Sequence, residues 1–219
     1  MGSLYAKDVI STALNEIGYE AEGSNKKYTI YSAELDAVDY FNTKKNGSAD
    51  WCAIFVIWCM YANTRNANGE IEADKWDAEY FQYQPDRSTC AGVGYMADYY
   101  QKNDAWISDP SDLERGDVVT FRNYAHTGLV VDWDADGFYT VEGNVDGGKV
   151  AKRFYRYNDP NVDGFCRPRY DGFEFKPDES GSNDNTEPTV QEVKITITVK
   201  TENPEAVKNA LKGATITVE

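Results

Sequence analysis

Apolar residues recur at helical spacing in three stretches of this chain. Residues 4–17 carry apolar side chains three and four positions apart and end at Gly18, which predicts an amphipathic helix. Residues 51–62 are apolar nearly all round, so a buried helix is expected there, with Asp50 at its N-cap. A third helix is expected over residues 93–102.

Outside these helices the pattern is polar or alternating. Residues 20–48 are polar, with scattered Tyr, Asn and Gly, and are expected to form a long surface loop. After Trp106, short alternating runs separated by turn residues predict strands. The expected strands are 116–121, 127–133, 138–144, 151–157 and 164–170. Helices first and an antiparallel sheet later indicate an α+β domain over residues 4–172.

The C-terminal part differs in composition. Residues 173–189 are rich in Pro, Gly, Ser, Asn and acidic side chains, which predicts an acidic linker. Residues 190–219 show a strand pattern, a short helix opened by Asn203-Pro204, and a second strand. About 30 residues bury too little apolar surface to fold alone. This small β-α-β segment is therefore expected to begin a truncated second domain or to dock on another surface.

Charge and hydropathy narrow the range of partners. The net charge is −15 and 41% of the residues are hydrophobic, so the chain has an acidic surface and enough apolar side chains for a core. A basic face, which nucleic-acid binders usually show, is not visible. No apolar run reaches the length of about 20 residues that spans a membrane, and no signal peptide is recognisable at the N-terminus. Neither nucleic acid nor membrane is expected as a partner.

The four cysteines do not form a metal motif. The chain has no CxxC pair and a single histidine, which argues against a structural zinc site. Cys52 and Cys59 lie two helical turns apart, about 10 Å in rise, which is too far for a disulfide. A bridge from Cys90 to Cys59 or to Cys166 remains open.

An acidic run resembles the start of a calcium loop. Residues 132–137 place Asp at every second position before Gly137, but the twelfth position is Gly143 where such a loop has Glu. A hairpin turn through residues 134–136, with Gly137 in the left-handed conformation, is expected instead. No cofactor is expected. Calcium held by this turn is the alternative.

Cys52 is the candidate nucleophile. A thiol attacks as the thiolate, and the free N–H groups and dipole at a helix N-terminus stabilise that anion. Cys52 lies in the first turn of its expected helix, on the side that faces the sheet edge, whereas Cys59 lies two turns further in. The alternative is that Cys52 is a small core residue, as buried cysteines often are.

His126, the only histidine, is the candidate base. The expected hairpin places it opposite Asn144 and places Gly128 opposite Glu142, all on one face. Glu142 or Asn144 can then hold the imidazole in the required tautomer. Glu142 is favoured as the direct partner because a carboxylate also stabilises the imidazolium. The alternative is an ordinary hairpin with a surface histidine.

These residues resemble the CHAP domain (cysteine, histidine-dependent amidohydrolase/peptidase), a family within the NlpC/P60-like, papain-like superfamily. The resemblance runs from about residue 4 to 172. Its motifs are Trp51-Cys52-Ala53-x-Phe55-Val56-x-Trp58-Cys59, Arg115-Gly116-Asp117-Val118-Val119-Thr120-Phe121, His126-Thr127-Gly128-Leu129-Val130 and Val141-Glu142-Gly143-Asn144, with Gly23-Ser24-Asn25 upstream and Gly164-Phe165-Cys166-Arg167-Pro168-x-Tyr170 at the end. Thr127 stands where the family usually has Val or Ile, on the opposite face from the site.

The resemblance implies a papain-like α+β fold and hydrolysis of a peptidoglycan amide bond, as in phage endolysins and bacterial wall hydrolases. By it, Cys52 is the nucleophile, His126 the base, and Glu142 and Asn144 complete the site. Some members of the family bind calcium through acidic residues ahead of the cysteine, and this chain has Glu34, Asp36 and Asp39 in that stretch. It implies action at the cell wall, by secretion or by release of a phage lysin from the cytoplasm. Two other functions stay open: a papain-like protease that cleaves protein, and a wall-binding module without activity.

Overall fold

The computed structural model describes residues 2–38, 50–84, 89 and 91–174, which belong to one compact unit, residues 1–177. The segment 190–219, and the expected linker from residue 175 onward, lie outside the described residues. The helices are α1 (Ala6–Asn15), α2 (Ile30–Ala37), α3 (Cys52–Tyr61), α4 (Ala78–Gln82) and α5 (Val93–Lys102), with short 3₁₀ turns η1 (Ala73–Lys75) and η3 (Pro110–Asp112). The strands are β1 (Trp106–Ile107), β2 (Val118–Phe121), β3 (His126–Trp133), β4 (Gly137–Val145), β5 (Lys149–Arg156) and β6 (Val162–Cys166).

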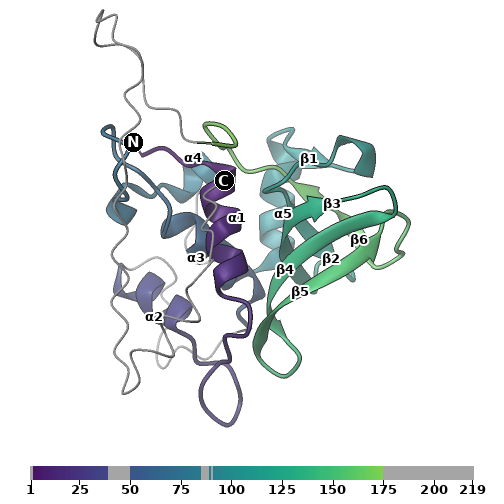
Figure 1. Ribbon diagram of the computed structural model, residues 1–219, viewed down its shortest axis with the longest axis horizontal. Coiled ribbons are helices and arrows are strands. Elements are labelled where there is room, and N and C mark those ends of the chain that lie inside the picture. The colour runs from purple at the N-terminus through teal and green to yellow at the C-terminus, as the bar shows by residue number, and fades with distance from the viewer. Residues whose placement is uncertain (1, 39–49, 85–88, 90, 175–219) are drawn as a thin grey trace, which may run out of the picture. The chain divides into compact units, whose positions relative to one another are not determined.

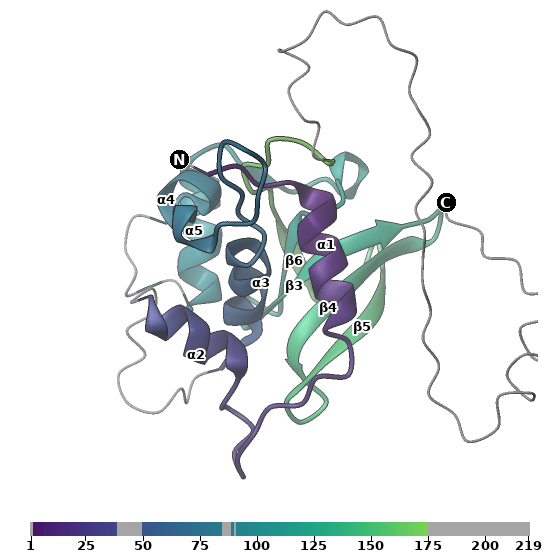
Figure 2. The ribbon, with the colours of Figure 1, turned by 60° about the vertical axis from the view of Figure 1, so that its left-hand side comes forward.

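The strands form one antiparallel sheet in the order β1-β6-β2-β3-β4-β5. Figures 1 and 2 show the helices gathered on one side of the molecule and the strands on the other. The predicted α+β architecture is therefore confirmed. The α5 helix has the predicted bounds, and the predicted ends of the strands lie within two residues of those observed, except the end of β6. That strand ends at Cys166, two residues before Pro168, which has no N–H for the ladder.

The sheet is strongly curled. The ring centroids of Phe121 on β2 and Tyr155 on β5 lie 4.6 Å apart, although β3 and β4 separate the two strands. In a flat sheet three strand spacings would hold them about 14 Å apart. The concave face encloses a small apolar cluster of Leu113, Val119, Phe121, Val130, Phe138 and Phe165.

The other face of the sheet carries the main core, with α3 packed on β3 and β4. Nine of the ten residues of α3 are buried, as its continuous apolar sequence predicts. The helix approaches β4 closely at Gly143, where an added Cβ would lie 2.7 Å from Phe55 Cβ and 2.7 Å from the Trp51 ring. A side chain at position 143 would therefore lift the start of α3 off the sheet.

The predicted loop over residues 20–48 is wrong in part, because α2 lies within it. The Thr29 side chain caps this helix by accepting from Ser32 N at 3.0 Å. Tyr31 and Leu35, four positions apart, are completely buried. A single buried pair among polar residues gives too short an apolar stripe for the pattern to be recognised along the chain.

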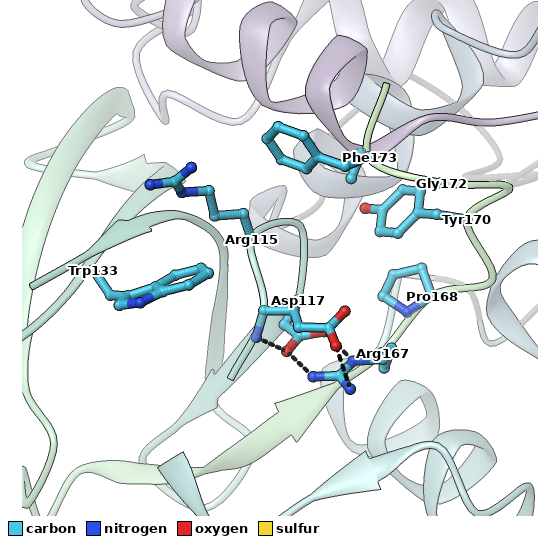
Figure 3. Close-up of a pocket in the computed structure, with 10 residues that line it drawn as sticks. Arg115, Asp117, Trp133, Arg167, Pro168, Tyr170, Gly172 and Phe173 are labelled. Atoms are coloured by element: carbon cyan, nitrogen blue, oxygen red, sulfur yellow. Dashed lines mark hydrogen bonds and ion pairs between the residues drawn. The ribbon is translucent and has the colours of Figure 1, made fainter. Parts of the chain in front are cut away.

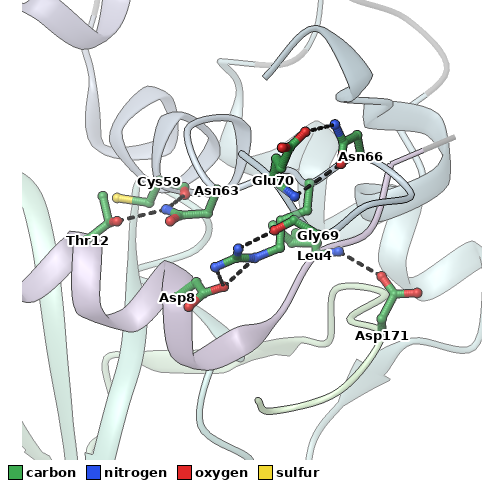
Figure 4. A network of polar contacts seen from close by, with 10 residues as sticks. Leu4, Asp8, Thr12, Cys59, Asn63, Asn66, Gly69, Glu70 and Asp171 are labelled. Carbon is green, nitrogen blue, oxygen red and sulfur yellow. Dashed lines mark hydrogen bonds and ion pairs between the residues drawn. The ribbon is translucent and has the colours of Figure 1, made fainter. Parts of the chain in front are cut away.

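A polar network fixes α1 across the end of α3 (Figure 4). The Arg65 guanidinium donates to Asp8 Oδ2 through Nε at 2.9 Å and through Nη2 at 2.6 Å. Asn63 Nδ2 donates to Thr12 Oγ1 at 2.8 Å and to the carbonyl of Cys59 at 2.7 Å. The bond to Cys59 O satisfies a carbonyl in the last turn of α3, and the other bonds hold α1 against the segment that follows this helix.

Candidate active site

Trp51 sets the point at which α3 begins. Its side chain is completely buried, and its indole Nε1 donates to Lys26 O at 3.0 Å. Trp51 is the N-cap residue, so Cys52 is the first residue of the helix, with 5% of its surface exposed. The predicted position of Cys52 at the mouth of a buried helix is confirmed.

The predicted N-cap role of Asp50 is wrong. Because the helix begins at Cys52, Asp50 precedes the N-cap by one residue, and its side chain is 73% exposed. Its carboxylate forms an ion pair with Lys27 Nζ at 3.1 Å and accepts from Asn144 Nδ2 at 3.4 Å. Asn144 has a φ of 61°. Its amide is therefore directed to the segment before Cys52, while the imidazole of His126 has another partner.

That partner is Glu142. His126 Nε2 and Glu142 Oε2 lie 2.8 Å apart, and both side chains are buried. The favoured contact of the sequence prediction is present. Strands β3 and β4 pair Leu129 with Val141 in the predicted alignment, and toward the turn the register shifts by one residue, so that Asp132 pairs with Tyr139. The left-handed conformation predicted for Gly137 is wrong: its φ is not positive, and a Cβ there would lie 2.0 Å from Tyr155 O.

His126 meets Cys52 at the end of the sheet. By alternation along β3, His126 lies on the concave face with Val130, while Leu129 lies on the face that α3 covers. His126 is the first residue of β3, an interior strand, and Cys52 is the first residue of α3, so both lie at the start of their elements. The Cys52 side chain lies near enough to the imidazole to raise the pKa of His126, through a hydrogen bond and through charge. Because Nε2 is bonded to Glu142, Nδ1 is the nitrogen left for the sulfur.

These neighbours favour the imidazolium. Burial lowers the pKa of His126, but hydrogen bonds and charge from Cys52 and then from Glu142 outweigh it and raise the pKa from 6.5 to about 9. The ring also stacks on Phe121, with centroids 5.9 Å apart. The arrangement can therefore hold a thiolate against an imidazolium whose far side is held by a carboxylate.

Three further residues shape this cluster: Gly128, which the expected hairpin places opposite Glu142, and Thr140 and Tyr155, which the sequence analysis did not single out. A Cβ added at Gly128 would lie 2.5 Å from Glu142 Cγ, so the absence of a side chain there makes room for the carboxylate. Thr140 Oγ1 donates to Glu142 Oε1 at 2.5 Å, and Thr140 is completely buried. Tyr155 also hydrogen-bonds Glu142, and burial followed by this carboxylate raises its pKa. Alternation along β4 places Thr140 beside Glu142, which is the only signal that the sequence carried.

Internal hydrogen bonds stabilise the acidic turn between β3 and β4. Asp134 Oδ1 accepts from Asp136 N at 2.9 Å and from Gly137 N at 3.1 Å, and Oδ2 accepts from Tyr139 OH at 2.8 Å. Asp132 is paired with Arg115 at 2.7 Å. Among the residues that the structure describes, no group of three or more His, Cys, Asp or Glu side chains is placed to hold a metal ion.

The remaining cysteines lie in the core. Cys59 and Cys166 are buried free thiols, and burial raises the pKa of each well above its ordinary value. Their surroundings oppose thiolate formation at Cys59 and Cys166. Cys90, whose pairing the sequence left open, lies outside the described residues.

No protein-family model matches the chain, and no curated protein matches it. Two solved structures show partial similarity of fold. The peptidoglycan hydrolase RipB from Mycobacterium tuberculosis has a TM-score of 0.39 and 16% sequence identity, over 75% of this chain and 65% of that chain. Ly7917 has a TM-score of 0.40 and 12% identity, over 74% of this chain and 62% of that chain. The chain thus spans less than two thirds of either protein.

Over residues 2–38, 50–84, 89 and 91–174, no helix is both long and apolar enough to cross a bilayer.

Proposed function

We propose that this protein is a papain-like cysteine amidohydrolase that cleaves an amide bond in the peptide part of peptidoglycan. The observation that carries the proposal is the buried chain of contacts from Cys52 through His126 to Glu142. Nucleophile, base and orienting acid are the three groups that acyl transfer through a thiol requires. The substrate class rests on the resemblance of the sequence to the CHAP domain.

In the proposed mechanism the Cys52 thiolate attacks the carbonyl carbon of the amide. The imidazolium of His126 then donates its proton to the leaving amine, and a neutral imidazole and an acyl-enzyme remain. His126 next takes a proton from water, which hydrolyses the thioester and restores the thiolate and imidazolium. Glu142 holds the ring with Nδ1 toward the sulfur and stabilises its positive charge. No cofactor takes part in these steps.

The tetrahedral intermediate needs donors for its oxyanion. We assign one of them to the backbone N–H of Cys52, because the first N–H groups of a helix have no partner within it. Asn144 and Asp50 lie at the same helix start. We place Asn144 at the rim of the site, where it orders the segment that leads into Cys52.

The bond cleaved is tested by mass analysis of fragments released from purified cell walls. Muramoyl residues with a free lactyl carboxylate, together with peptides that begin at a free L-alanine amine, would identify an N-acetylmuramoyl–L-alanine amidase. New termini within the stem peptide or cross-bridge would identify an endopeptidase. If the enzyme cleaves unfolded protein but not cell walls, it is a papain-like protease and the proposed function is wrong. If the protein binds cell walls but releases no fragments, it is a wall-binding module without activity.

Ala at position 128 is expected to displace the orienting acid. The added methyl lies where Glu142 Cγ now passes, so the carboxylate moves away from His126. We expect kcat to fall by about 10- to 100-fold and the free energy of unfolding to fall by about 1–3 kcal/mol. Turnover of wall fragments and thermal denaturation measure the two effects. Gly94→Ala is the control, because a Cβ added there would lie 3.9 Å from Tyr124 Cβ, and it should lower neither kcat nor the free energy of unfolding.

Thr140 is expected to act as a positioning residue. Thr140→Val keeps the shape but removes the hydrogen bond to Glu142, so kcat should fall about tenfold while KM changes little. Thr140→Ser should restore most of the loss because it keeps the hydroxyl.

Thr127→Val is the matched control for Thr140. This buried threonine donates to Val119 O at 2.7 Å, away from the site, so its loss should affect stability alone. Equal kcat values for the two Val variants would contradict the role of Thr140.

A further inference from the structure

Trp133 stands between two hollows on the surface, at the end of β3 remote from His126. The first hollow has a volume of about 430 Å³ and is drawn in Figure 3. The second has a volume of about 600 Å³ and is bordered by Trp133 and Tyr157. Seven residue steps along β3 separate Trp133 from His126, or about 23 Å. The hollows are therefore distinct from the thiol site.

Aromatic rings line both hollows and remain accessible. Trp133 is 39% exposed and Phe173 is 42% exposed, and Figure 3 shows them on different sides of the first hollow. The Arg115 guanidinium lies 5.0 Å from the centroid of the Trp133 ring, and Asp132 holds that guanidinium through two hydrogen bonds. The indole is thus set in place before any ligand arrives, which lowers the entropic cost of binding.

The charges around the first hollow are already paired. Arg167 forms ion pairs with Asp117 at 2.9 Å and with Glu114 at 3.2 Å, and Arg115 is paired with Asp132. A charged ligand would have to compete with these pairs, whereas a neutral ligand would not. Their exposed edges still offer N–H donors and carboxylate acceptors to hydroxyl groups.

The second hollow adds neutral polar groups to the aromatic surface. Ser111 and Asn158 border it and are exposed, and Tyr157 OH is held by the carbonyl of Asp134 at 2.8 Å. Arg115 does not border the second hollow, so the guanidinium does not separate the Trp133 indole from this hollow. Fixed aromatic faces flanked by hydroxyl, amide and paired charged groups suit a ligand with apolar ring faces and many hydroxyls.

We propose that the two hollows on either side of Trp133 form a binding site for a neutral oligosaccharide, with sugar rings packed on Trp133 and Phe173. That the natural ligand is the glycan strand of the wall rests on the proposed function, but the binding of a neutral sugar chain does not. A glycan held here would keep the enzyme on the polymer whose peptides reach the Cys52 site.

The test is titration of the full wild-type chain with chitotetraose, a neutral tetramer of N-acetylglucosamine, followed by calorimetry and by tryptophan fluorescence. Saturable binding is expected, with affinity reduced at least tenfold in Trp133→Ala and in Phe173→Ala. Phe154→Ala is the matched control, because Phe154 on β5 is also 42% exposed but borders neither hollow, and it should bind as the wild type does.

Absence of saturable binding by the folded wild-type chain would overturn the inference. So would binding that Trp133→Ala and Phe173→Ala leave unchanged. The binding assay needs no turnover, so the two proposals can be refuted separately. Cleavage of wall peptide without sugar binding would refute only the glycan site. Sugar binding without cleavage would refute only the amidohydrolase function.

Discussion

Cys52→Ala and Cys52→Ser are expected to abolish the release of fragments from cell walls while the protein stays folded. The thiolate is the proposed nucleophile, and neither a methyl nor a neutral hydroxyl replaces it at a site built for sulfur. The loss should be on the order of 10⁴-fold or more in kcat. Cys52 is a small side chain at the sheet edge, so its removal leaves little unfilled volume and the melting temperature should change by only a few degrees.

Cys59→Ala is the matched control for Cys52. It replaces a cysteine of the same helix that is completely buried in the core. The small void should lower the free energy of unfolding by about 1 kcal/mol, with kcat unchanged. Thermal denaturation and release of wall fragments, measured on both variants, give opposite patterns. Turnover by Cys52→Ala at the wild-type rate would exclude Cys52 as the nucleophile.

Glu142→Gln is expected to lower kcat by about 10²- to 10³-fold and to shift the pH profile. The amide still accepts a hydrogen bond from His126 but no longer offers a charge to the imidazolium. Together with Cys52, Glu142 raises the pKa of His126 from 6.5 to about 9, and the alkaline limb of kcat/KM should therefore lie near pH 9 in the wild type. In Glu142→Gln this limb should move to lower pH.

The free energy of unfolding should depend on the same titration of His126. A histidine whose pKa is raised on folding stabilises the protein fully below its unfolded pKa, near 6.5, and loses that contribution as the pH rises through about 9. The loss should be smaller in Glu142→Gln, because the folded pKa is less raised. Urea denaturation between pH 6 and pH 10 measures it. The control Glu16→Gln removes a carboxylate bonded to Tyr31 OH at 2.8 Å and should leave the alkaline limb in place. If the alkaline limb of kcat/KM is unchanged in Glu142→Gln, Glu142 does not act on His126 in the catalytic site.

The regular parts of the fold could be predicted because their signals are local. The α3 helix has a continuous apolar sequence, and β3 and β4 are runs of eight and nine residues with β-branched and aromatic side chains between turn residues. Such patterns act along the chain and do not depend on a partner. The α2 helix was missed because its stability comes from burial of Tyr31 and Leu35 against the core, which no local pattern records.

The candidate site divides in the same way. The sequence by itself determined its chemistry: one histidine, a cysteine at the start of an apolar helix, and a carboxylate and an amide two residues apart on a strand. Only the tertiary structure decided that Glu142 bonds the imidazole and that Asn144 turns toward Asp50. Because Gly143 has no side chain, α3 can pack closely on the sheet, and because Gly128 has none, the Glu142 carboxylate can reach His126. Such close approaches depend on segments far apart in the chain, so spacing along the sequence does not reveal them.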